Sequence, residues 1–277
     1  MPELPEVETV RRALHAEICG WRIAATKVRE TRLRRPVRAA SLRQIDGQRF
    51  VDVQRRAKYL LLWTEADQAL VIHLGMTGRV DLHLPVGVPV ARHDHVQWEL
   101  TAGKRRLEMR YHDPRRFGLV VRLARRSVAT HPLFARLGPE PLGPEFDANY
   151  LRRKARHSRR PIKNFIMDGG VVVGVGNIYA SEALWRAEIN PKTVAGRVGP
   201  TRCDRLRQAI VEVLGDAIAQ GGTTLNDYRD PAGNAGYFSV QLDAYGREGQ
   251  RCNRCSGKVR RIVQSGRSTF YCPGCQS

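Results

Sequence analysis

The sequence predicts an α+β protein of several domains: an N-terminal helix with a β-sandwich, then a helical domain, then a small cysteine-rich module. Three observations predict this order. A helical apolar pattern covers residues 5–19, short alternating runs follow up to about residue 123, and a helical pattern returns after the proline-rich residues 137–144. A chain of 277 residues is long enough for one large or two medium domains and an appendage.

The N-terminal helix is predicted over residues 5–19. Pro5 suits the first turn of a helix, where the missing N–H is not needed, and Gly20 can end the helix. The apolar residues between them follow helical spacing and predict one buried face: Val7, Val10, Leu14 and Ile18.

Short β-like runs separated by turn residues follow Trp21. They predict strands at 50–53, 59–63, 69–74, 96–100, 107–111 and 118–122, with a hairpin connection within 99–105. Several short strands after one helix are typical of a β-sandwich. We therefore assign residues 1–130 to an N-terminal β-sandwich domain that includes the helix.

The sequence pattern changes after the sandwich. Residues 131–149 are predicted to be a linker, because they include a run with three prolines and two glycines. A helical domain is predicted over 150–240, and its longest helix begins near Thr201, where Thr201 and Asp204 resemble an N-terminal cap. Residues 241–277 form the predicted cysteine-rich module.

The net charge indicates a polyanionic partner. Lysine and arginine number 47 against 27 aspartates and glutamates, a formal charge of +20, and such an excess is typical of nucleic-acid binding. The alternative is a cationic surface that serves only solubility. The apolar runs are too short for a membrane helix, so no membrane partner is expected.

The first ten residues, MPELPEVETV, carry acidic residues where a secretion signal would carry lysines, and no hydrophobic stretch follows them. We therefore expect a cytoplasmic protein, and its cysteine usage agrees with this. Cys19 and Cys203 are isolated and are expected to be reduced packing residues.

Four cysteines near the C-terminus predict a metal site. Two Cys-x-x-Cys pairs separated by sixteen residues supply four thiolates at the spacing of a tetrahedral Zn²⁺ site: Cys252, Cys255, Cys272 and Cys275. Disulfides are the alternative, and a reducing cytoplasm disfavours them. With four cysteine ligands and no open position, the single zinc ion is expected to be structural.

The residues between the two cysteine pairs, 259–271, can fold as a hairpin with Ser265 and Gly266 at its tip. Such a hairpin would present Arg267 to an anion. The alternative is that Arg267 is a solvated turn residue.

The N-terminus offers a nucleophile if Met1 is removed. Pro2 then carries a secondary amine, and an α-amine with a pKa of roughly 7.7–8.0 is partly unprotonated at neutral pH. Such an amine can attack a sugar C1′ and form an iminium ion, and a carboxyl group of Glu3 or Glu6 could transfer protons there. The alternative is an ordinary helix start, where the helix dipole favours acidic residues.

Nine segments carry motifs in a fixed order along the chain. They read MPELPEVET at 1–9, QRRAKYL at 54–60, HLGMTG at 73–78, HDHV at 93–96, DPRRFG at 113–118, GVGNIYASE at 174–182, QGGTTL at 220–225, YGREG at 245–249 and QSGRSTFYCPGC at 264–275. Over essentially the whole length they resemble the formamidopyrimidine-DNA glycosylases, the oxidised-purine branch of the Fpg–Nei family. Leu4 separates the chain from endonuclease VIII, which usually has glycine at this position.

The resemblance implies a fold, an activity and partners. The fold is a β-sandwich with an N-terminal helix, a helix–two-turn–helix DNA-binding domain and a C-terminal zinc finger. The activity is that of a monomeric, bifunctional glycosylase and AP lyase of base excision repair, which removes 8-oxoguanine and formamidopyrimidines from damaged double-stranded DNA. The enzyme would act through a proline Schiff base and cleave the strand by β,δ-elimination, in association with the bacterial nucleoid.

The resemblance also implies catalytic roles, position by position. Pro2 corresponds to the nucleophile, and Glu3 to the proton donor for sugar opening and base departure. Lys58 corresponds to the proton donor for β-elimination and lies near a phosphate. Arg267 corresponds to the residue that assists δ-elimination and contacts phosphate. From the residues alone, Lys58 could be an ordinary lysine before a strand.

Further residues match positions that contact DNA in the family. The implied DNA contacts are His93, Arg115, Arg159, Asn177, Met76 and Phe117. The implied base-recognition residues are Glu6, Thr223 and Thr224. Met76, Arg115 and Phe117 match the residues that fill the gap left by a flipped nucleotide. Without the resemblance, Met76 and Phe117 are equally compatible with core positions.

Two other functions are compatible with parts of the sequence. One is a sister enzyme for oxidised pyrimidines with the same nucleophile, and Leu4 together with the Thr223–Thr224 loop argues against it. The other is a non-enzymatic zinc-ribbon protein that binds nucleic acid through charge alone. The presence of Pro2, Glu3 and Lys58 argues against this second alternative.

Overall fold

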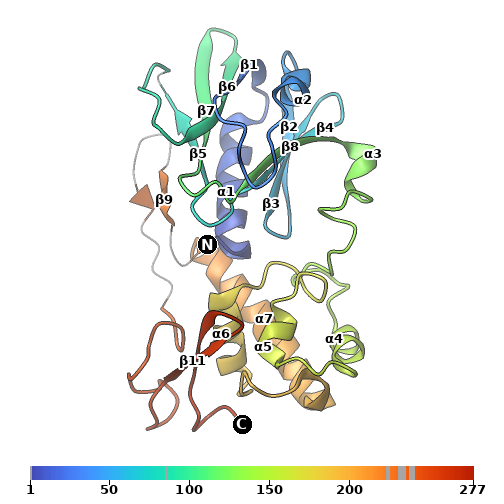
Figure 1. The fold of residues 1–277 in the computed structure, drawn as a ribbon, viewed down its shortest axis with the longest axis vertical. Helices are drawn as coiled ribbons and strands as arrows, with labels where there is room; N and C mark the ends of the chain where they lie inside the picture. The colour runs from blue at the N-terminus through green and yellow to red at the C-terminus, as the bar shows by residue number, and fades with distance from the viewer. Residues whose placement is uncertain (1, 85, 223–224, 230–234, 237–240) are drawn as a thin grey trace. The chain divides into compact units, whose positions relative to one another are not determined.

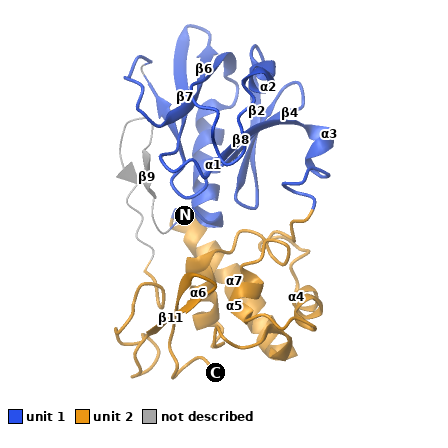
Figure 2. Ribbon diagram, viewed as in Figure 1, with its two compact units in different colours: residues 1–135, 221–239 blue, residues 136–220, 240–277 orange. Residues whose placement is uncertain are grey.

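The computed structural model describes residues 2–84, 86–222, 225–229, 235–236 and 241–277, with the backbone alone for 225–229 and 235–236. The chain forms two compact units, Met1–Ala135 with Gly221–Ser239, and Arg136–Gln220 with Val240–Ser277 (Figures 1 and 2). The finer division of the sequence into three domains and a linker stays a prediction.

The first unit contains two four-stranded sheets and one long helix. Its elements are α1 (Leu4–Ile18), β1 (Arg22–Val28), α2 (Ala39–Leu42), η1 (Arg43–Ile45), β2 (Phe50–Arg56), β3 (Tyr59–Thr64), β4 (Gln68–His73), β5 (Arg79–His83), β6 (Asp94–Ala102), β7 (Arg105–His112), β8 (Leu119–Ala124), α3 (Arg125–Val128), β9 (Leu225–Arg229) and β10 (Ala235–Gly236). One antiparallel sheet has the order β1-β6-β7-β5, the other has the order β2-β3-β4-β8, and β9 pairs with β10. Figure 1 shows α1 alongside the two sheets.

The core of the first unit is shared by α1 and both sheets. Val7, Val10 and Leu14 of α1 are buried in one cluster with Leu60 of one sheet and Trp98 of the other. Full burial of one large apolar side chain stabilises a fold by roughly 1.5–3 kcal/mol. The apolar stripe read from the sequence therefore fixes α1 against both sheets.

Most predicted elements of this unit are confirmed, with ends shifted by a few residues. Gly20 ends α1 with a φ of 88°, and the predicted hairpin connection lies between β6 and β7, where Ala102 pairs with Arg105. The sequence reading missed β1 and β5. β1 buries only Ile23 and Thr26, and β5 buries only Val80 and Leu82. Neither strand contains a run of large apolar residues like those of β3 and β4.

The second unit consists of helices around a separate core, together with a two-stranded hairpin. Its elements are α4 (Ala148–Ala155), α5 (Ile162–Ile166), α6 (Asn177–Arg186), η2 (Ala195–Arg197), α7 (Pro200–Ala219), β11 (Arg260–Gln264) and β12 (Arg267–Tyr271). Leu151, Phe165, Leu184 and Leu214 bring four of these helices into the same buried cluster. Among the described residues, no helix combines the length and the apolar composition needed to cross a membrane.

The predicted cap of the longest helix is wrong. Gly199 is the N-cap of α7 and Pro200 occupies its first turn, so Thr201 and Asp204 lie inside the helix. Proline has a φ close to the helical value, and the first helical position does not need an N–H donor. Pro200 therefore starts the helix ahead of the threonine.

A buried carboxylate attaches the cysteine-rich residues to the helices of the second unit. Glu182 of α6 is 6% exposed, and it accepts backbone N–H bonds from Asp243, Ala244 and Tyr245 at 2.8, 3.0 and 2.7 Å. Burial raises the pKa of Glu182, and the three N–H donors oppose this rise because they favour the charged form. Residues 243–245 are thus fixed on α6.

Replacing Glu182 with glutamine is expected to lower the free energy of unfolding of this unit by about 2 kcal/mol. The amide NH₂ group would face N–H donors that the carboxylate satisfies, and an unsatisfied buried group costs about 1–3 kcal/mol. Urea unfolding measures the change. The matched control is Glu248→Gln, an exposed carboxylate 3.8 Å from Arg261, which should change stability by less than about 0.5 kcal/mol. Equal stability of the two variants would contradict the role of Glu182.

Candidate active site and nucleic-acid interface

Pro2 stands directly before α1, next to two buried carboxyl groups. Glu3 is the N-cap residue and forms a capping box with Glu6, whose Oε2 accepts the Glu3 N–H at 2.8 Å. Glu3 and Glu6 are 2% and 3% exposed. The positive end of the helix dipole stabilises negative charge at this position. The local sequence therefore places groups that can transfer protons beside the residue that bears the predicted nucleophile.

Gly222 lies against Glu6 in the same unit. Its φ is +92°, and a Cβ at this position would meet Glu6 Oε1 at 3.0 Å. The chain therefore passes the Glu6 carboxyl group immediately before Thr223 and Thr224, the two predicted base-recognition residues that lie outside the described residues.

Lys58 is half-buried in the turn between β2 and β3, directly before β3. Arg55 of β2 binds Glu8 of α1 at 3.0 Å, and it donates a second bond to the carbonyl of Ala57 at 3.1 Å. This ion pair is largely buried, with side chains 11% and 13% exposed. It ties the first turns of α1 to the hairpin that carries Lys58, so the predicted nucleophile and the predicted lysine stand on two connected elements.

His73 at the end of β4 belongs to the same region. It pairs with Tyr59 across β3 and β4, with ring centroids 4.8 Å apart, and its Nδ1 accepts the Gly75 N–H at 2.9 Å. Burial, followed by the charges of Arg34 and Lys58, lowers the pKa of His73 to about 4. The ring is therefore neutral at physiological pH, and Arg34 is a second cation that acts on His73 beside Lys58 and that the sequence did not predict.

One carboxylate joins the loop 74–78 after β4 to the loop 113–118 between β7 and β8. Asp113 is fully buried and accepts hydrogen bonds from Thr77 Oγ1 at 2.7 Å and from the backbone N–H of Gly118 at 2.8 Å. A buried carboxylate with several donors holds its partners firmly because breaking any one bond leaves charge uncompensated. The two loops therefore form one rigid pair.

These two loops present three of the predicted DNA-contact residues. Met76 is 39% exposed and Phe117 is 47% exposed, so the alternative that they are core residues is wrong. The Arg115 guanidinium lies 4.7 Å from the centroid of the Phe117 ring. A Cβ on Gly75 would lie 2.6 Å from the Gly118 nitrogen, so the loops touch backbone to backbone. Exposed apolar side chains on a rigid support are typical of an interaction site.

His93, another predicted DNA contact, stands just before β6 among further histidines. Its ring centroid is 5.8 Å from that of His112 and 6.2 Å from that of His95. Asp94 holds His112 through a 2.7 Å bond to Nδ1 and also pairs at 3.3 Å with Arg110, which is 1% exposed. This buried network fixes the His112 ring beside His93.

In the second unit a buried ammonium group joins three elements. Lys163 of α5 is 1% exposed and donates to Asn177 Oδ1 at 2.6 Å, to Thr269 Oγ1 at 2.7 Å and to the Ser268 carbonyl at 3.2 Å. Asn177, the first residue of α6, donates to the same carbonyl at 2.9 Å. The predicted DNA contact Asn177 is therefore held in place, together with the start of β12, on α5.

The predicted hairpin is confirmed, and Arg267 stands just past its tip. Gln264 pairs with Arg267, and Ser265 and Gly266 make the turn with φ values of 47° and 73°. Asn164 of α5 donates to Ser265 Oγ at 2.7 Å. Arg267 is exposed, so an outward guanidinium is carried on a backbone that is fixed on both sides.

The four cysteines form a compact cluster that fits one zinc ion. Their Sγ atoms lie within 4.8 Å of one another, with Cys252 and Cys275 at 3.8 Å and Cys255 and Cys272 at 3.5 Å. Sulfurs about 2.3 Å from a tetrahedral Zn²⁺ are about 3.8 Å apart, whereas a disulfide needs about 2.05 Å. All four cysteines are free thiols in the structure. The cluster is a site for one structural zinc ion, and the disulfide alternative is wrong.

The structure does not bring Arg159 together with the other predicted site residues, and it adds Lys163, which the sequence did not predict. Arg159 is exposed in the segment between α4 and α5, where its predicted DNA contact stays a prediction. Lys163 was missed by the sequence reading. The sequence contains only a weak sign that Lys163 is buried. Its neighbours Ile162, Phe165 and Ile166 are apolar and buried, but this pattern does not show that the lysine is buried with them.

Three family models match the chain in sequence order. They describe the N-terminal domain of formamidopyrimidine-DNA glycosylase at residues 1–120, the H2TH domain of the same enzyme at residues 137–229, and a zinc finger found in FPG and IleRS at residues 249–277. The predicted fold class, including the helix–two-turn–helix domain, is confirmed.

Curated relatives match over the full length. The chain is 50% identical to the formamidopyrimidine-DNA glycosylase of Thioalkalivibrio sulfidiphilus, covering 100% of both chains, and 47% identical to that of Magnetococcus marinus, covering 100% of this chain and 99% of the other.

Solved structures match equally far along the chain. A complex between Lactococcus lactis Fpg and DNA containing an abasic site has a TM-score of 0.89 and 32% identity, covering 99% of each chain. A structure of MutM with DNA containing carbocyclic 8-oxo-G has a TM-score of 0.88 and 32% identity, covering 100% of each chain.

Replacing His73 with asparagine is expected to flatten the pH dependence of stability. The unfolded histidine titrates near pH 6.5 and the folded one near pH 4, so the unfolded chain binds more protons between these values. The free energy of unfolding therefore falls as the pH drops from 6.5 to 4, by up to about 3 kcal/mol.

Urea unfolding at a series of pH values between 7 and 4 measures this dependence. Asparagine keeps an acceptor for the Gly75 N–H and does not titrate. The exposed His15 gives the control, because His15→Asn should keep the original slope. An unchanged slope in His73→Asn would show that another group carries the pH dependence.

Proposed function

The chain belongs to the formamidopyrimidine-DNA glycosylase family, and on this premise we propose that it removes oxidised purines from duplex DNA as a bifunctional glycosylase and AP lyase. The observation that carries the proposal is the start of α1, where Pro2 stands beside Glu3 and Glu6, which are 2% and 3% exposed. An N-terminal secondary amine beside buried carboxyl groups suits Schiff-base catalysis. A protein that binds nucleic acid by charge alone has no use for it.

The first chemical step is base removal. The unprotonated nitrogen of Pro2 forms a bond to C1′ while the bond between C1′ and the base breaks. The Pro2 nitrogen loses its own proton as this bond forms, and the base departs with that proton. Glu3 donates a proton to the ring oxygen as the sugar opens. The product is a cationic iminium between Pro2 and C1′.

Strand cleavage follows from the iminium, which withdraws electrons and acidifies the hydrogens on C2′. Loss of a C2′ proton expels the 3′-phosphate, and Lys58 is assigned to proton transfer in this step. Loss of a further proton expels the 5′-phosphate, while Arg267 neutralises the departing phosphate. Water then hydrolyses the iminium, which frees Pro2 and releases the sugar remnant as an unsaturated aldehyde.

The target nucleotide must leave the base stack before Pro2 can reach C1′, at a cost of a few kcal/mol. We assign Met76, Arg115 and Phe117 to the gap that remains. Their exposure and their rigid loops support this assignment, because a thioether and a flat ring can replace lost stacking. The Arg115 guanidinium can donate hydrogen bonds to the unpaired base.

The remaining predicted DNA contacts, His93, Arg159 and Asn177, are assigned to phosphates. The fixed position of Asn177 between Lys163 and β12 supports its assignment. Base recognition is assigned to Glu6, Thr223 and Thr224. The contact of Gly222 with Glu6 supports the proximity of this segment to the carboxyl group.

The zinc ion has a structural part in this proposal. Bound by the four cysteines, it supplies folding energy and holds the two cysteine turns that flank the hairpin of Arg267. The net charge of +20 supports a DNA partner. We propose that the protein acts as a monomer on nucleoid DNA in the bacterial cytoplasm.

Pro2→Gly is expected to reduce borohydride trapping and strand cleavage by about a hundredfold or more, the scale of losing a catalytic group. The substrate is a duplex with 8-oxoguanine opposite cytosine, and gel electrophoresis and intact mass measure the covalent adduct. Arg12→Gln, an exposed change on the same helix, is the control and should trap normally. Undiminished trapping by Pro2→Gly, or an active preparation that still carries Met1, would rule out the assigned nucleophile.

Removing zinc is expected to lower affinity for the lesion duplex at least as much as Arg267→Ala does in the zinc-loaded protein. The reason is that the cysteine turns lose their fold without metal, so the hairpin no longer holds Arg267. Fluorescence anisotropy measures affinity. Arg260→Ala, an exposed arginine on β11 of the same hairpin, controls for loss of charge. A metal-free preparation with full affinity would remove the zinc from the proposal.

A further inference from the structure

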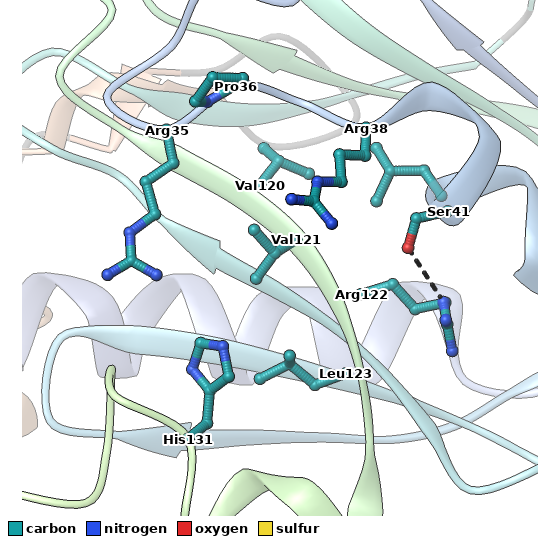
Figure 3. Close-up of a pocket in the computed structure, with 10 residues that line it drawn as sticks. Arg35, Pro36, Arg38, Ser41, Val120, Val121, Arg122, Leu123 and His131 are labelled. Carbon is teal, nitrogen blue, oxygen red and sulfur yellow. Dashed lines mark hydrogen bonds between the residues drawn. The ribbon is translucent and has the colours of Figure 1, made fainter.

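A pocket of about 380 Å³ lies in the first unit, beside the outer strand β8 and the segment that leads into α2. Cationic side chains surround it: Arg35, Arg38, Arg122 and His131. Figure 3 shows Arg35 and His131 at one end, Arg122 with Ser41 at the other, and Arg38 with Val121 between them. The proposed catalytic groups Pro2, Glu3, Lys58 and Arg267 do not line it.

The backbone that carries two of these arginines is fixed. Leu33 and Val37 are 8% and 4% exposed and belong to the sandwich core, and the Val37 N–H donates to the Thr31 carbonyl at 2.8 Å. Arg35 and Arg38 are therefore exposed side chains on an anchored segment. A guanidinium on an anchored backbone loses less freedom when it binds a ligand.

The third arginine is held by its own hydrogen bonds. Arg122 Nε donates to Ser41 Oγ at 3.3 Å, and its Nη1 donates to Gln68 Oε1. Both partners are neutral, so the positive charge of Arg122 is oriented without being neutralised by them. The Arg122 guanidinium is therefore held in one orientation with its positive charge, at the end of the pocket opposite Arg35.

No carboxylate lines the pocket in the part of the chain that the structure describes. Over the same residues, neither Arg35 nor Arg38 takes part in an ion pair, whereas Arg55 pairs with Glu8 at 3.0 Å. Three guanidinium groups in one cavity without a counter-charge repel one another, and an anionic ligand removes that repulsion.

His131 adds a neutral donor. Its Nδ1 accepts the Leu133 N–H at 3.3 Å, and burial together with the charge of Arg35 lowers the pKa of His131. The neutral ring then carries its proton on Nε2, where it can donate one hydrogen bond.

The rest of the lining is apolar. Val121 and Leu123 of β8 and Pro36 opposite them offer hydrocarbon surface within the same cavity. The volume lies in the range of small-molecule sites, about 300–1,000 Å³, so a bare anion would leave most of it unfilled. A ligand that fits has a doubly charged head for the arginines and a flat apolar body for the valine and leucine.

We propose that this pocket binds a nucleoside monophosphate group, with the phosphate on Arg35, Arg38 and Arg122 and the base against Val121 and Leu123. The arginine fork matches phosphate oxygens in pairs, and a dianion balances several cations better than one carboxylate does. The same chemistry is offered by a free nucleotide and by the 5′-phosphorylated end of a DNA strand. The site is separate from the groups of the glycosylase reaction and does not depend on their roles.

Isothermal titration of the full-length, zinc-loaded protein with dGMP tests the proposal. Saturable binding of dGMP is expected, at least tenfold tighter than that of inorganic phosphate or deoxyguanosine, because each of these lacks half of the recognised group. The double variant Arg35→Gln with Arg38→Gln should weaken dGMP binding at least tenfold. Pro2→Gly should bind dGMP normally, which separates failure of this site from failure of the proposed nucleophile.

A matched control removes two other arginines of the same unit. Arg43 and Arg126 are exposed and do not line the pocket, so Arg43→Gln with Arg126→Gln should change dGMP affinity less than twofold. Val121→Glu, which adds a negative charge beside the arginines, should also abolish binding. This variant keeps the test decisive if thermal unfolding shows that the first double variant is unstable.

Competition identifies the source of the ligand. A twelve-nucleotide strand with a 5′-phosphate that displaces dGMP better than the same strand with a 5′-hydroxyl assigns the pocket to strand ends, and equal competition assigns it to free nucleotides. Three results overturn the proposal: no saturable dGMP binding, equal loss in both double variants, or tighter binding of an acidic peptide that ends in leucine.

Discussion

The way α1 begins is the constraint on which the proposed chemistry depends. The Glu3 N–H is held by Glu6 at 2.8 Å, the proline ring fixes φ of Pro2, and the peptide bond between Pro2 and Glu3 is planar. Only ψ of Pro2 is left to orient its nitrogen. The helix is itself buried against both sheets, so the fold of the first unit would orient the proposed Pro2 amine.

Buried charges repeat this principle elsewhere in the molecule. Asp113 joins two loops in the first unit, and in the second unit Lys163 and Glu182 attach the C-terminal residues to the helices. Each group is fully or almost fully buried and makes several hydrogen bonds. Such groups fix geometry because no alternative arrangement satisfies them. Met76 and Phe117 stand on the loops joined by Asp113, and Arg267 directly precedes the residues bound by Lys163.

The sequence predicts what periodicity and spacing encode. The structure confirms three of these sequence patterns. They are the apolar stripe of α1, the apolar runs of the central strands and the spacing of the four cysteines. The strands β1 and β5 were missed because each of them buries only two residues. The prediction of Thr201 as the cap rests on its side chain, which can accept a backbone N–H bond. It does not take into account that Pro200 fits the first helical position. Lys163 was missed because burial of a charge depends on partners about a hundred residues away.

The hydrogen bonds from residues 243–245 to Glu182 are one of several attachments between the C-terminal module and the helices. The C-terminal module is attached through α5 and α6, and also through Gln276, which donates to the Ile189 carbonyl at 2.9 Å. Its place in the second unit is therefore set by these bonds in addition to the covalent chain, so the position of the Arg267 hairpin depends on the packing of α5 and α6.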